Sequence, residues 1–157
     1  MLDTKRIIIL NVLTVLLLVA CTKEDSTTTN DNSEQYSDTP SITFISVTPS
    51  PVKELDSLTF KISYKDGNGD LGENTYNAKN VFVTDLRTHT TDSLRVQRLV
   101  EGETSAHIKG NMNIVLYDIA IQGSNDKDTV SYTIQVRDRA GNKSNVVTTS
   151  PIIINRN

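Results

Sequence analysis

The feature that most restricts the fold is a strict alternation of apolar and polar side chains in two distant segments. Every second residue is apolar from Leu58 to Lys65, and the same alternation returns from Val130 to Arg137. Successive side chains of a β-strand point to opposite faces, so each segment is predicted to be a strand buried on one face. No window between residues 41 and 157 has a convincing helical period. We therefore expect an all-β domain with these two strands at its centre.

Five less regular segments complete a prediction of seven strands. They are Ile42 to Val47, Val81 to Leu86, Leu94 to Val100, Ile114 to Ile121 and Val146 to Ile154. The first changes phase between Phe44 and Ile45, which predicts a bulge, and the last contains Pro151, which belongs at a sheet edge. Turn residues separate the segments at a spacing that suits two antiparallel sheets packed as a sandwich.

The amino-terminal segment is typical of a secretory signal peptide. Lys5 and Arg6 precede an apolar run of about thirteen residues, which is shorter than the ~20 that a membrane-spanning helix needs. Small Ala20 lies directly before Cys21, the one cysteine in the chain. A single cysteine is unusual in an exported protein, because oxidising compartments favour cysteine pairs.

The stretch Leu18-Val19-Ala20-Cys21 resembles a bacterial lipobox. The resemblance implies that residues 1–20 are a lipoprotein signal peptide and that Cys21 is the lipidation site, acylated and held in a membrane by its lipid anchor. A plain signal peptide or an uncleaved anchor is the alternative. The following Thr22-Lys23-Glu24-Asp25 resembles the signal that sends Bacteroidetes-type lipoproteins to the outer face of the outer membrane. We therefore expect a cell-surface location. A periplasm-facing lipoprotein is the alternative, since charged terminal stretches are usually solvated.

Residues 21–39 are expected to be the lipidated cysteine and a disordered tether, and residues 40–157 one domain. From residue 26 to 39 the chain is polar apart from Tyr36, and such a composition buries too little apolar area to offset the entropy of ordering. The formal net charge of the chain is −3, and no basic block occurs. Nucleic acid is therefore not an expected partner.

The run from Asp128 to Asn142 resembles the sixth strand and following turn of fibronectin type III and bacterial immunoglobulin-like domains. The resemblance implies a seven-stranded antiparallel immunoglobulin-like sandwich, with Tyr132 as a corner tyrosine whose hydroxyl bonds to backbone upstream. The chain departs from antibody domains because it has no tryptophan and no cysteine pair. Likeness of fold does not by itself carry a function.

The most distinctive chemical segment runs from Asp66 to Glu73, where oxygen-bearing side chains alternate with glycines. Such a loop can curve tightly and surround a hard cation such as Ca²⁺. The segment resembles the opening of an EF-type calcium loop and similar loops in Bacteroidetes-type lipoproteins. It departs from EF loops at the sixth position, where Leu71 replaces glycine, and at the twelfth, where Asn77 replaces glutamate.

An immunoglobulin-like sandwich brings the loops after its second and sixth strands to the same pole, where they could share a cation. The candidate calcium ligands are therefore Asp66, Asn68, Asp70, Glu73, Asp138 and Asn142. The alternative is an ordinary glycine-rich turn whose carboxylates are solvated, because Asp, Asn and Gly are the usual residues of turns.

The sequence gives little support for a catalytic function. His89 and His107 lie in polar stretches without a clear strand or helix pattern, and no known catalytic motif occurs. A hydrolase using Asp70 and Glu73 is a less favoured reading. We expect a non-catalytic interaction module that contacts an envelope protein or a polysaccharide, with a calcium-stiffened spacer as the alternative.

A sugar-binding module would need an exposed aromatic side chain. Tyr64, Tyr117 and Tyr132 are predicted to be buried, which leaves Tyr76 as the sugar-binding candidate.

Overall fold

The computed structural model of the chain describes residues 35–100 and 106–157. The predicted signal peptide, Cys21 and the tether up to residue 34 lie outside these residues. The described part contains ten strands and no helix, which confirms the predicted all-β class. Within it, no helix could cross a membrane. The strands are β1 (Ser41–Thr48), β2 (Val52–Lys53), β3 (Leu58–Asp66), β4 (Val81–Asp85), β5 (Thr91–Leu94), β6 (Ile108–Leu116), β7 (Lys127–Val130), β8 (Tyr132–Val136), β9 (Val147–Thr148) and β10 (Ile152–Asn155).

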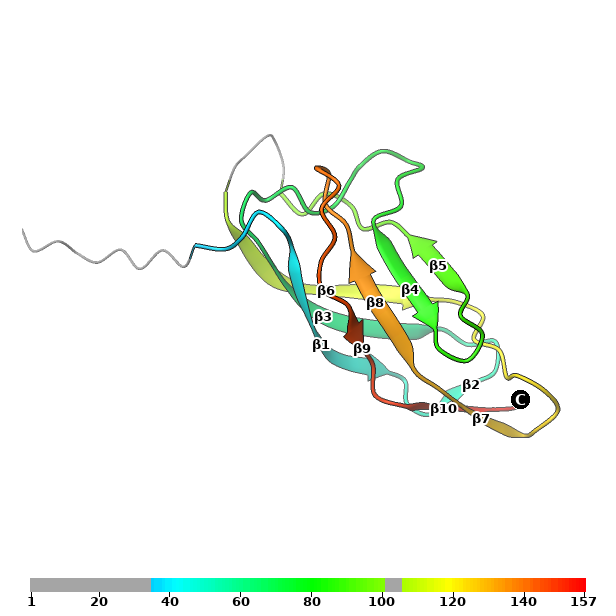
Figure 1. Cartoon of the computed structure of the whole chain (residues 1–157). Coiled ribbons are helices and arrows are strands. Elements are labelled where there is room, and N and C mark those ends of the chain that lie inside the picture. The colour runs from blue at the N-terminus through cyan, green and yellow to red at the C-terminus, as the bar shows by residue number, and fades with distance from the viewer. Residues whose placement is uncertain (1–34, 101–105) are drawn as a thin grey trace, which may run out of the picture. The chain divides into compact units, whose positions relative to one another are not determined.

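The strands form three sheets with the orders β1-β3-β6, β5-β4-β8-β9 and β2-β10-β7. All strand pairs are antiparallel except β2 with β10, which is parallel. Figure 1 shows β1, β3 and β6 side by side as one group and β4 and β8 side by side in another. The two groups meet through Phe60 of β3 and Tyr132 of β8, whose ring centroids lie 5.4 Å apart in an edge-to-face contact. Such contacts join the sheets into a layered all-β domain.

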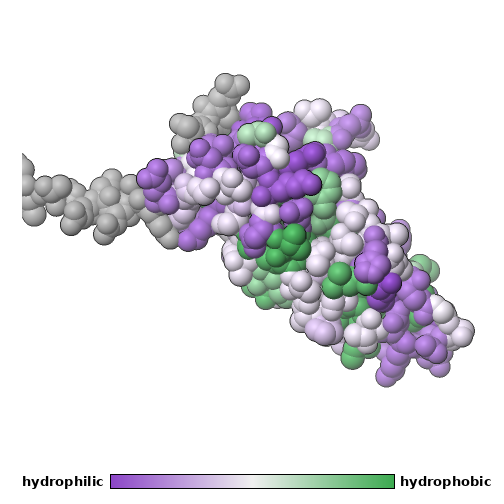
Figure 2. Space-filling model, in the orientation of Figure 1, coloured by the Kyte–Doolittle hydropathy of each residue, from purple (hydrophilic) through white to green (hydrophobic). Residues whose placement is uncertain are grey.

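The core is built from the alternating residues that the sequence marks as apolar. Leu58, Phe60 and Ile62 of β3 are fully buried, as is Ile134 of β8, and all belong to one apolar cluster. Figure 2 shows a largely hydrophilic face with smaller hydrophobic patches. Burial of the alternate side chains accounts for the stability of these strands, at roughly 1.5–3 kcal/mol for each large apolar side chain removed from water.

Two of the seven predicted strands are each divided between sheets. The segment from 127 to 136 pairs with β10 as β7 and then with β4 and β9 as β8. The carboxyl-terminal segment pairs with β8 as β9, and beyond Pro151 with β2 and β7 as β10. Pro151 has no N–H to donate to a ladder, so the sheet partner changes at that point. The two divisions and the short, unpredicted β2 account for ten strands where seven were expected.

The predicted strand from Leu94 to Val100 is displaced. The observed strand, β5, ends at Leu94. Beyond it, the side chain of Asn80 bonds to the backbone of Val96: it accepts from the Val96 N–H at 2.7 Å and donates to the Val96 carbonyl at 2.8 Å. The Asn80 side chain thus forms the hydrogen bonds that a neighbouring strand would otherwise form with Val96.

The prediction of Ile114 to Ile121 is displaced in the same way, since β6 begins at Ile108 and ends at Leu116. Asp118 has a positive φ of 57°, which is incompatible with a continuing strand. The predicted bulge in β1 is confirmed by a register shift between Phe44 and Ser46.

The end of the predicted tether packs against the domain. The centroid of the Tyr36 ring lies 4.8 Å from the Lys65 Nζ atom and 6.1 Å from the centroid of the His107 ring. The N–H of Gly67 donates to the carbonyl of Ser37 at 2.8 Å. Among the described residues, contacts with the folded domain therefore already occur at Tyr36, four residues before Pro40.

Candidate metal centre

Two loops at one pole of the domain carry the candidate site. The first loop follows Asp66, the last residue of β3, and the second follows β8. The first loop leads into β4, whose first residue Val81 pairs with Val136, the last residue of β8. Both loops therefore lie at the same end of the domain. Asp66 and Asp70 of the first loop and Asp138 of the second each offer a carboxylate oxygen, and these oxygens all lie within 4.8 Å of one another.

These three aspartates form what we call the aspartate triad, and it is largely withdrawn from solvent. Asp66 is 0% exposed and Asp138 is 5% exposed. The Oδ1 atoms of Asp66 and Asp70 are buried and have no hydrogen-bond partner in the described part of the chain. Buried polar atoms in folded proteins nearly always have a partner, so these two oxygens require an explanation.

The remaining oxygens of the triad accept hydrogen bonds from neutral donors. Asp66 Oδ2 accepts from the N–H of Leu71 at 2.9 Å, and Asp70 Oδ2 accepts from the N–H of Ala140 at 3.0 Å. Asp138 accepts from the backbone N–H and the side-chain amide of Asn142, at 2.7 and 2.9 Å. These bonds orient the carboxylates, and the charge of nearby Arg139 also favours the ionised form of Asp70.

The pKa values reflect this crowding. Burial raises the pKa of Asp66 to about 6, and the nearby charges of Asp70 and Asp138 raise it further, while the Leu71 N–H opposes the shift. Burial also raises the pKa of Asp70, with the charge of Asp138 adding to the effect. Close carboxylates with little solvent disfavour one another's ionisation, and a bound cation would reverse that preference.

Gly69 allows the first loop to fold tightly against the rest of the domain. Its φ is +68°, and a Cβ atom at this position would lie 2.4 Å from the carbonyl oxygen of Ala106. A side chain is therefore excluded both by conformation and by space. The close approach sets the path of the chain between Asp66 and Asp70.

The structure does not bring the other three candidate ligands into the triad. Asn68 Oδ1 accepts from the N–H of Asp70 at 3.3 Å, within its own turn. Glu73 Oε1 accepts from the N–H groups of Asn74 and Thr75, at 2.7 and 3.1 Å, and the Thr75 N–H is the largest cause of a lowered pKa at Glu73. Asn142 forms hydrogen bonds with Asp138: it donates two to the Asp138 carboxylate, and its backbone carbonyl accepts one from the Asp138 N–H at 3.1 Å.

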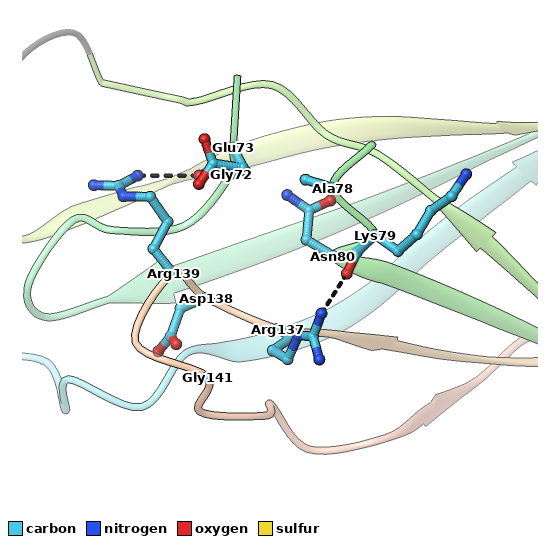
Figure 3. Close-up of a pocket in the computed structure, with 9 residues that line it drawn as sticks. All are labelled: Gly72, Glu73, Ala78, Lys79, Asn80, Arg137, Asp138, Arg139 and Gly141. Carbon is cyan, nitrogen blue, oxygen red and sulfur yellow. Dashed lines mark hydrogen bonds between the residues drawn. The ribbon is translucent and has the colours of Figure 1, made fainter. Parts of the chain in front are cut away.

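A hollow of about 210 Å³ lies beside the triad and is lined by Asp138, Lys79, Arg137 and Arg139, among others. Figure 3 shows the Arg139 guanidinium donating to the carbonyl of Gly72, at 3.0 Å, and Arg137 donating to the carbonyl of Lys79, at 2.8 Å. Both guanidinium groups thus bond to backbone. Of the three aspartates of the triad, Asp138 lines this hollow.

The predicted burial of the tyrosines requires one correction. Tyr117 is 69% exposed, because Met112, Ile114 and Leu116 are the inward-facing residues of β6 and Tyr117 continues the outward-facing phase. Tyr132 is buried as predicted, at 3% exposed, while Tyr64 is half-buried and Tyr76 is 86% exposed. Among the described hydrogen bonds, none joins the Tyr132 hydroxyl to backbone, so the expected corner bond is not seen.

One charged cluster was not anticipated from the sequence. Arg87 pairs with Asp85 at 2.6 Å and also with Asp128, at the pole opposite the aspartate triad. The spacing of Asp85 and Arg87 within a turn is a weak local signal for a pair. Nothing local connects either residue with Asp128, which lies 41 positions after Arg87.

Comparisons with known proteins add little to these observations. No family model matches the chain, and no curated protein matches it. A solved structure, the X-ray structure of Northeast Structural Genomics Consortium target SoR45, is 12% identical and covers 74% of this chain and 83% of its own. Its TM-score is 0.27, which is too low to support an argument about fold or function.

Proposed function

We propose that this chain is a lipid-anchored, non-catalytic interaction module of the cell envelope, with Ca²⁺ bound by the aspartate triad. The observation that carries the proposal is the convergence of three carboxylate oxygens within 4.8 Å of one another, together with two buried oxygens that lack partners. Calcium–oxygen distances are about 2.3–2.6 Å, so two ligands on opposite sides of one ion lie about 5 Å apart. The spacing of the triad suits a shared ion.

The chemistry of the donors favours calcium among the common metals. The triad offers only carboxylate oxygens, which prefer hard cations, and it contains no histidine or cysteine that would favour zinc. Calcium accepts six to eight oxygen ligands in irregular geometry, and three carboxylates from two loops, completed by solvent or backbone carbonyls, would meet that need more readily than the strict octahedron of Mg²⁺.

A calcium ion at this place would act on structure rather than on a substrate. It would join the loop after β3 to the loop after β8, and so stiffen one pole of the domain. The hydrolase reading would pair Asp70 with Glu73, but Glu73 accepts hydrogen bonds from Asn74 and Thr75 within its own turn and lies outside the triad, which argues against that reading. The same stiffening supports the alternative of a structural spacer.

The finer fold in this proposal is an immunoglobulin-like sandwich. In such a sandwich the strands lettered A, B and E share one sheet, while C, F and G share the other. The sheets β1-β3-β6 and β5-β4-β8-β9 match that division, with β2 and β10 as additions at an edge.

The location in this proposal rests on the sequence. Cys21 follows a short apolar segment that is typical of lipoprotein signals, and the outer face of the outer membrane is the favoured site, with the periplasmic face as the alternative. The partner would be an envelope protein or a polysaccharide. The net charge of −3 favours neither nucleic acid nor other polyanions.

The proposal is tested by thermal unfolding of the lipid-bearing chain in detergent, with added calcium and with chelator. We expect calcium to raise the melting temperature of the wild type and to raise that of Asp70→Asn much less. Asp126→Asn, at an exposed carboxylate in a different loop, serves as the matched control and should respond like the wild type. An equal calcium response in the wild type and in Asp70→Asn would exclude the triad as the binding site.

A further inference from the structure

A second hollow lies at the pole opposite the aspartate triad. It has a volume of about 320 Å³ and is lined by the turn after β4 and by the segment after β6. Its position follows from the strand registers, because Leu116 pairs with Leu58 and Asp85 pairs with Tyr132, at the ends remote from Asp66. Small-molecule sites usually occupy about 300–1,000 Å³, so this hollow reaches that range while the one beside the triad does not.

Tyr117 and Asp118 stand together at this hollow, and both are exposed. Side chains that follow one another in a strand point to opposite faces, but Asp118 has a φ of +57° and breaks that rule. Ile119 fixes the segment, since its N–H donates to the carbonyl of Asp56 at 3.1 Å and its carbonyl accepts from the N–H of Leu55 at 2.8 Å. The segment that carries Tyr117 and Asp118 is thereby fixed along one side of the hollow.

An ion-pair network makes the wall of the hollow rigid. The Arg87 guanidinium donates to both oxygens of Asp85 and to Asp128, and it also donates to the carbonyl of Ala120 at 3.2 Å. The side chains of Arg87 and Asp85 are only 16% and 14% exposed. Arg87 therefore ties the turn after β4 to the segment that carries Tyr117, so the two sides of the hollow are fixed relative to each other.

The charges around the hollow decide which ligands it suits. Arg87 is offset by Asp85, while Asp92 and Asp118 add negative charge at exposed positions. A phosphate, sulfate or uronate would meet repulsion there. Carboxylates are strong acceptors for hydroxyl and ammonium donors, and a tyrosine ring offers an apolar face with a polar tip. An uncharged or amino sugar combines the apolar ring face and the hydroxyl donors that this arrangement would satisfy.

We propose that this hollow binds a glycan of neutral or amino sugars. The ring of Tyr117 packs against the face of one sugar, and the carboxylates of Asp92 and Asp118 accept hydrogen bonds from its hydroxyl or ammonium groups. The site is separate from the aspartate triad and does not need calcium. It gives the interaction module a ligand class, and it replaces Tyr76 with Tyr117 as the sugar-contacting aromatic residue.

The experiment uses the lipid-bearing chain in detergent micelles, screened on a glycan array and then titrated with hexasaccharides of glucose, glucosamine and galacturonic acid. We expect binding to a neutral or amino glycan and none to the uronate. Tyr117→Ala should weaken binding at least tenfold, while Tyr76→Ala, at a tyrosine of similar exposure, should leave it unchanged. Chelator should have no effect, which separates this proposal from the calcium site.

A second variant guards against an effect of Tyr117→Ala on folding. Asp118→Asn keeps a side chain that tolerates positive φ but removes the charge, so it should fold normally and weaken binding several-fold. The proposal is overturned by binding to no neutral or amino glycan, by preference for the uronate, or by binding that Tyr76→Ala abolishes and Tyr117→Ala does not. Binding of hexalysine in place of any glycan would likewise overturn it and mark a peptide site.

Discussion

The carboxylate of Asp70 accepts a 3.0 Å hydrogen bond from the backbone N–H of Ala140, a residue 70 positions later in the chain. This bond joins the two loops that supply the aspartate triad, so the site exists only when β3 and β8 have taken their places in the domain. A ligand that binds only the folded chain stabilises it by mass action. Calcium binding and folding are therefore expected to be linked.

The first prediction concerns the size of that linkage. At a free calcium concentration about 100 times the Kd, calcium should add about 2.7 kcal/mol to the free energy of unfolding. Asp66→Asn and Asp70→Asn should each remove most of this increment, because each deletes a charged ligand while preserving shape. Chemical denaturation at several calcium concentrations measures it, and an increment that both variants retain in full would contradict the assignment.

The second prediction concerns pH. The pKa of Asp66 is about 6 in the folded domain, above the ~3.9 of an unfolded aspartate, so the metal-free folded state holds the proton more tightly. In chelator this group contributes its full stability below about pH 4 and loses it as pH rises through 6. With calcium the dependence reverses, because the ion requires the ionised carboxylate and is displaced by protons below about pH 6.

The comparison with Asp66→Asn isolates this group from the other carboxylates. Relative to the wild type, the variant should become more stable between pH 4 and pH 7 in chelator, and less stable over the same range in calcium. Unfolding free energies from urea titrations at each pH provide the measurement. Parallel pH profiles for the two proteins in chelator would show that Asp66 does not carry the raised pKa.

The third prediction concerns Arg87. Burial alone would raise the pKa of Asp85, but hydrogen bonds and charge from Arg87 hold it below its ordinary value. Arg87→Met would leave Asp85 and Asp128 without their cation, and we expect a loss of about 2–3 kcal/mol, less than for a fully buried pair because all three side chains are partly exposed. Arg156→Met is the control: the Arg156 side chain is 36% exposed, pairs with Glu54 at an N–O distance of 3.3 Å and donates to the carbonyls of Gly123 and Asn125, and because these bonds are exposed the change should cost under about 1 kcal/mol. Equal losses would show that the network adds nothing beyond a surface pair.

The fourth prediction separates backbone conformation from close packing at glycine. Gly72 and Gly123 have similar φ values, +88° and +84°, but a Cβ at Gly72 would lie 2.2 Å from the carbonyl oxygen of Gln97, whereas Gly123 has open space. Gly123→Ala should cost about 1–2 kcal/mol from its conformation alone. Gly72→Ala should cost at least about 2 kcal/mol more, because the backbone of Gln97 must move. Denaturant melts of both variants test the difference, and similar losses would refute the close approach.

The fifth prediction concerns anchoring. If Cys21 carries the lipid, Cys21→Ser should leave the protein in the aqueous fraction of disrupted cells, while the wild type requires detergent. Mass spectrometry of the wild-type amino terminus should show acyl chains on Cys21. An unmodified Cys21 in protein that sediments with membranes would point to an uncleaved anchor instead.

The sequence predicts the centre of the fold well because alternation is a direct consequence of strand geometry. β3 and β8 lie where the pattern places them, and the bulge in β1 follows from its change of phase. The predictions of the two displaced strands fail for a physical reason. The backbone beyond β5 bonds to the side chain of Asn80. The first half of β6 is mostly polar, so its sequence shows no clear alternation of apolar and polar residues. Such bonds depend on tertiary partners that a local pattern does not contain.

The candidate metal site is predictable only in part. Asp66, Asp70 and Asp138 come together because two loops share a pole, which follows from the assumed sandwich. The positions of Asn68 and Glu73 do not follow, because each forms hydrogen bonds within its own turn. The exposure of Tyr117 follows from the alternation of β6, whose inward-facing residues are Met112, Ile114 and Leu116, a phase that the displaced prediction of this strand did not identify.

The hydrogen bond from Gly67 to the carbonyl of Ser37 gives the cation site a mechanical meaning. In the proposed lipid-anchored protein, tension from the amino-terminal side would enter the domain at Tyr36 and Ser37, and the Gly67 hydrogen bond would pass part of that load to the residue after Asp66. An ion that clamps Asp66 to Asp138 would share this load with the loop that follows β8. The force that the anchored domain withstands before unfolding would then vary with the calcium concentration.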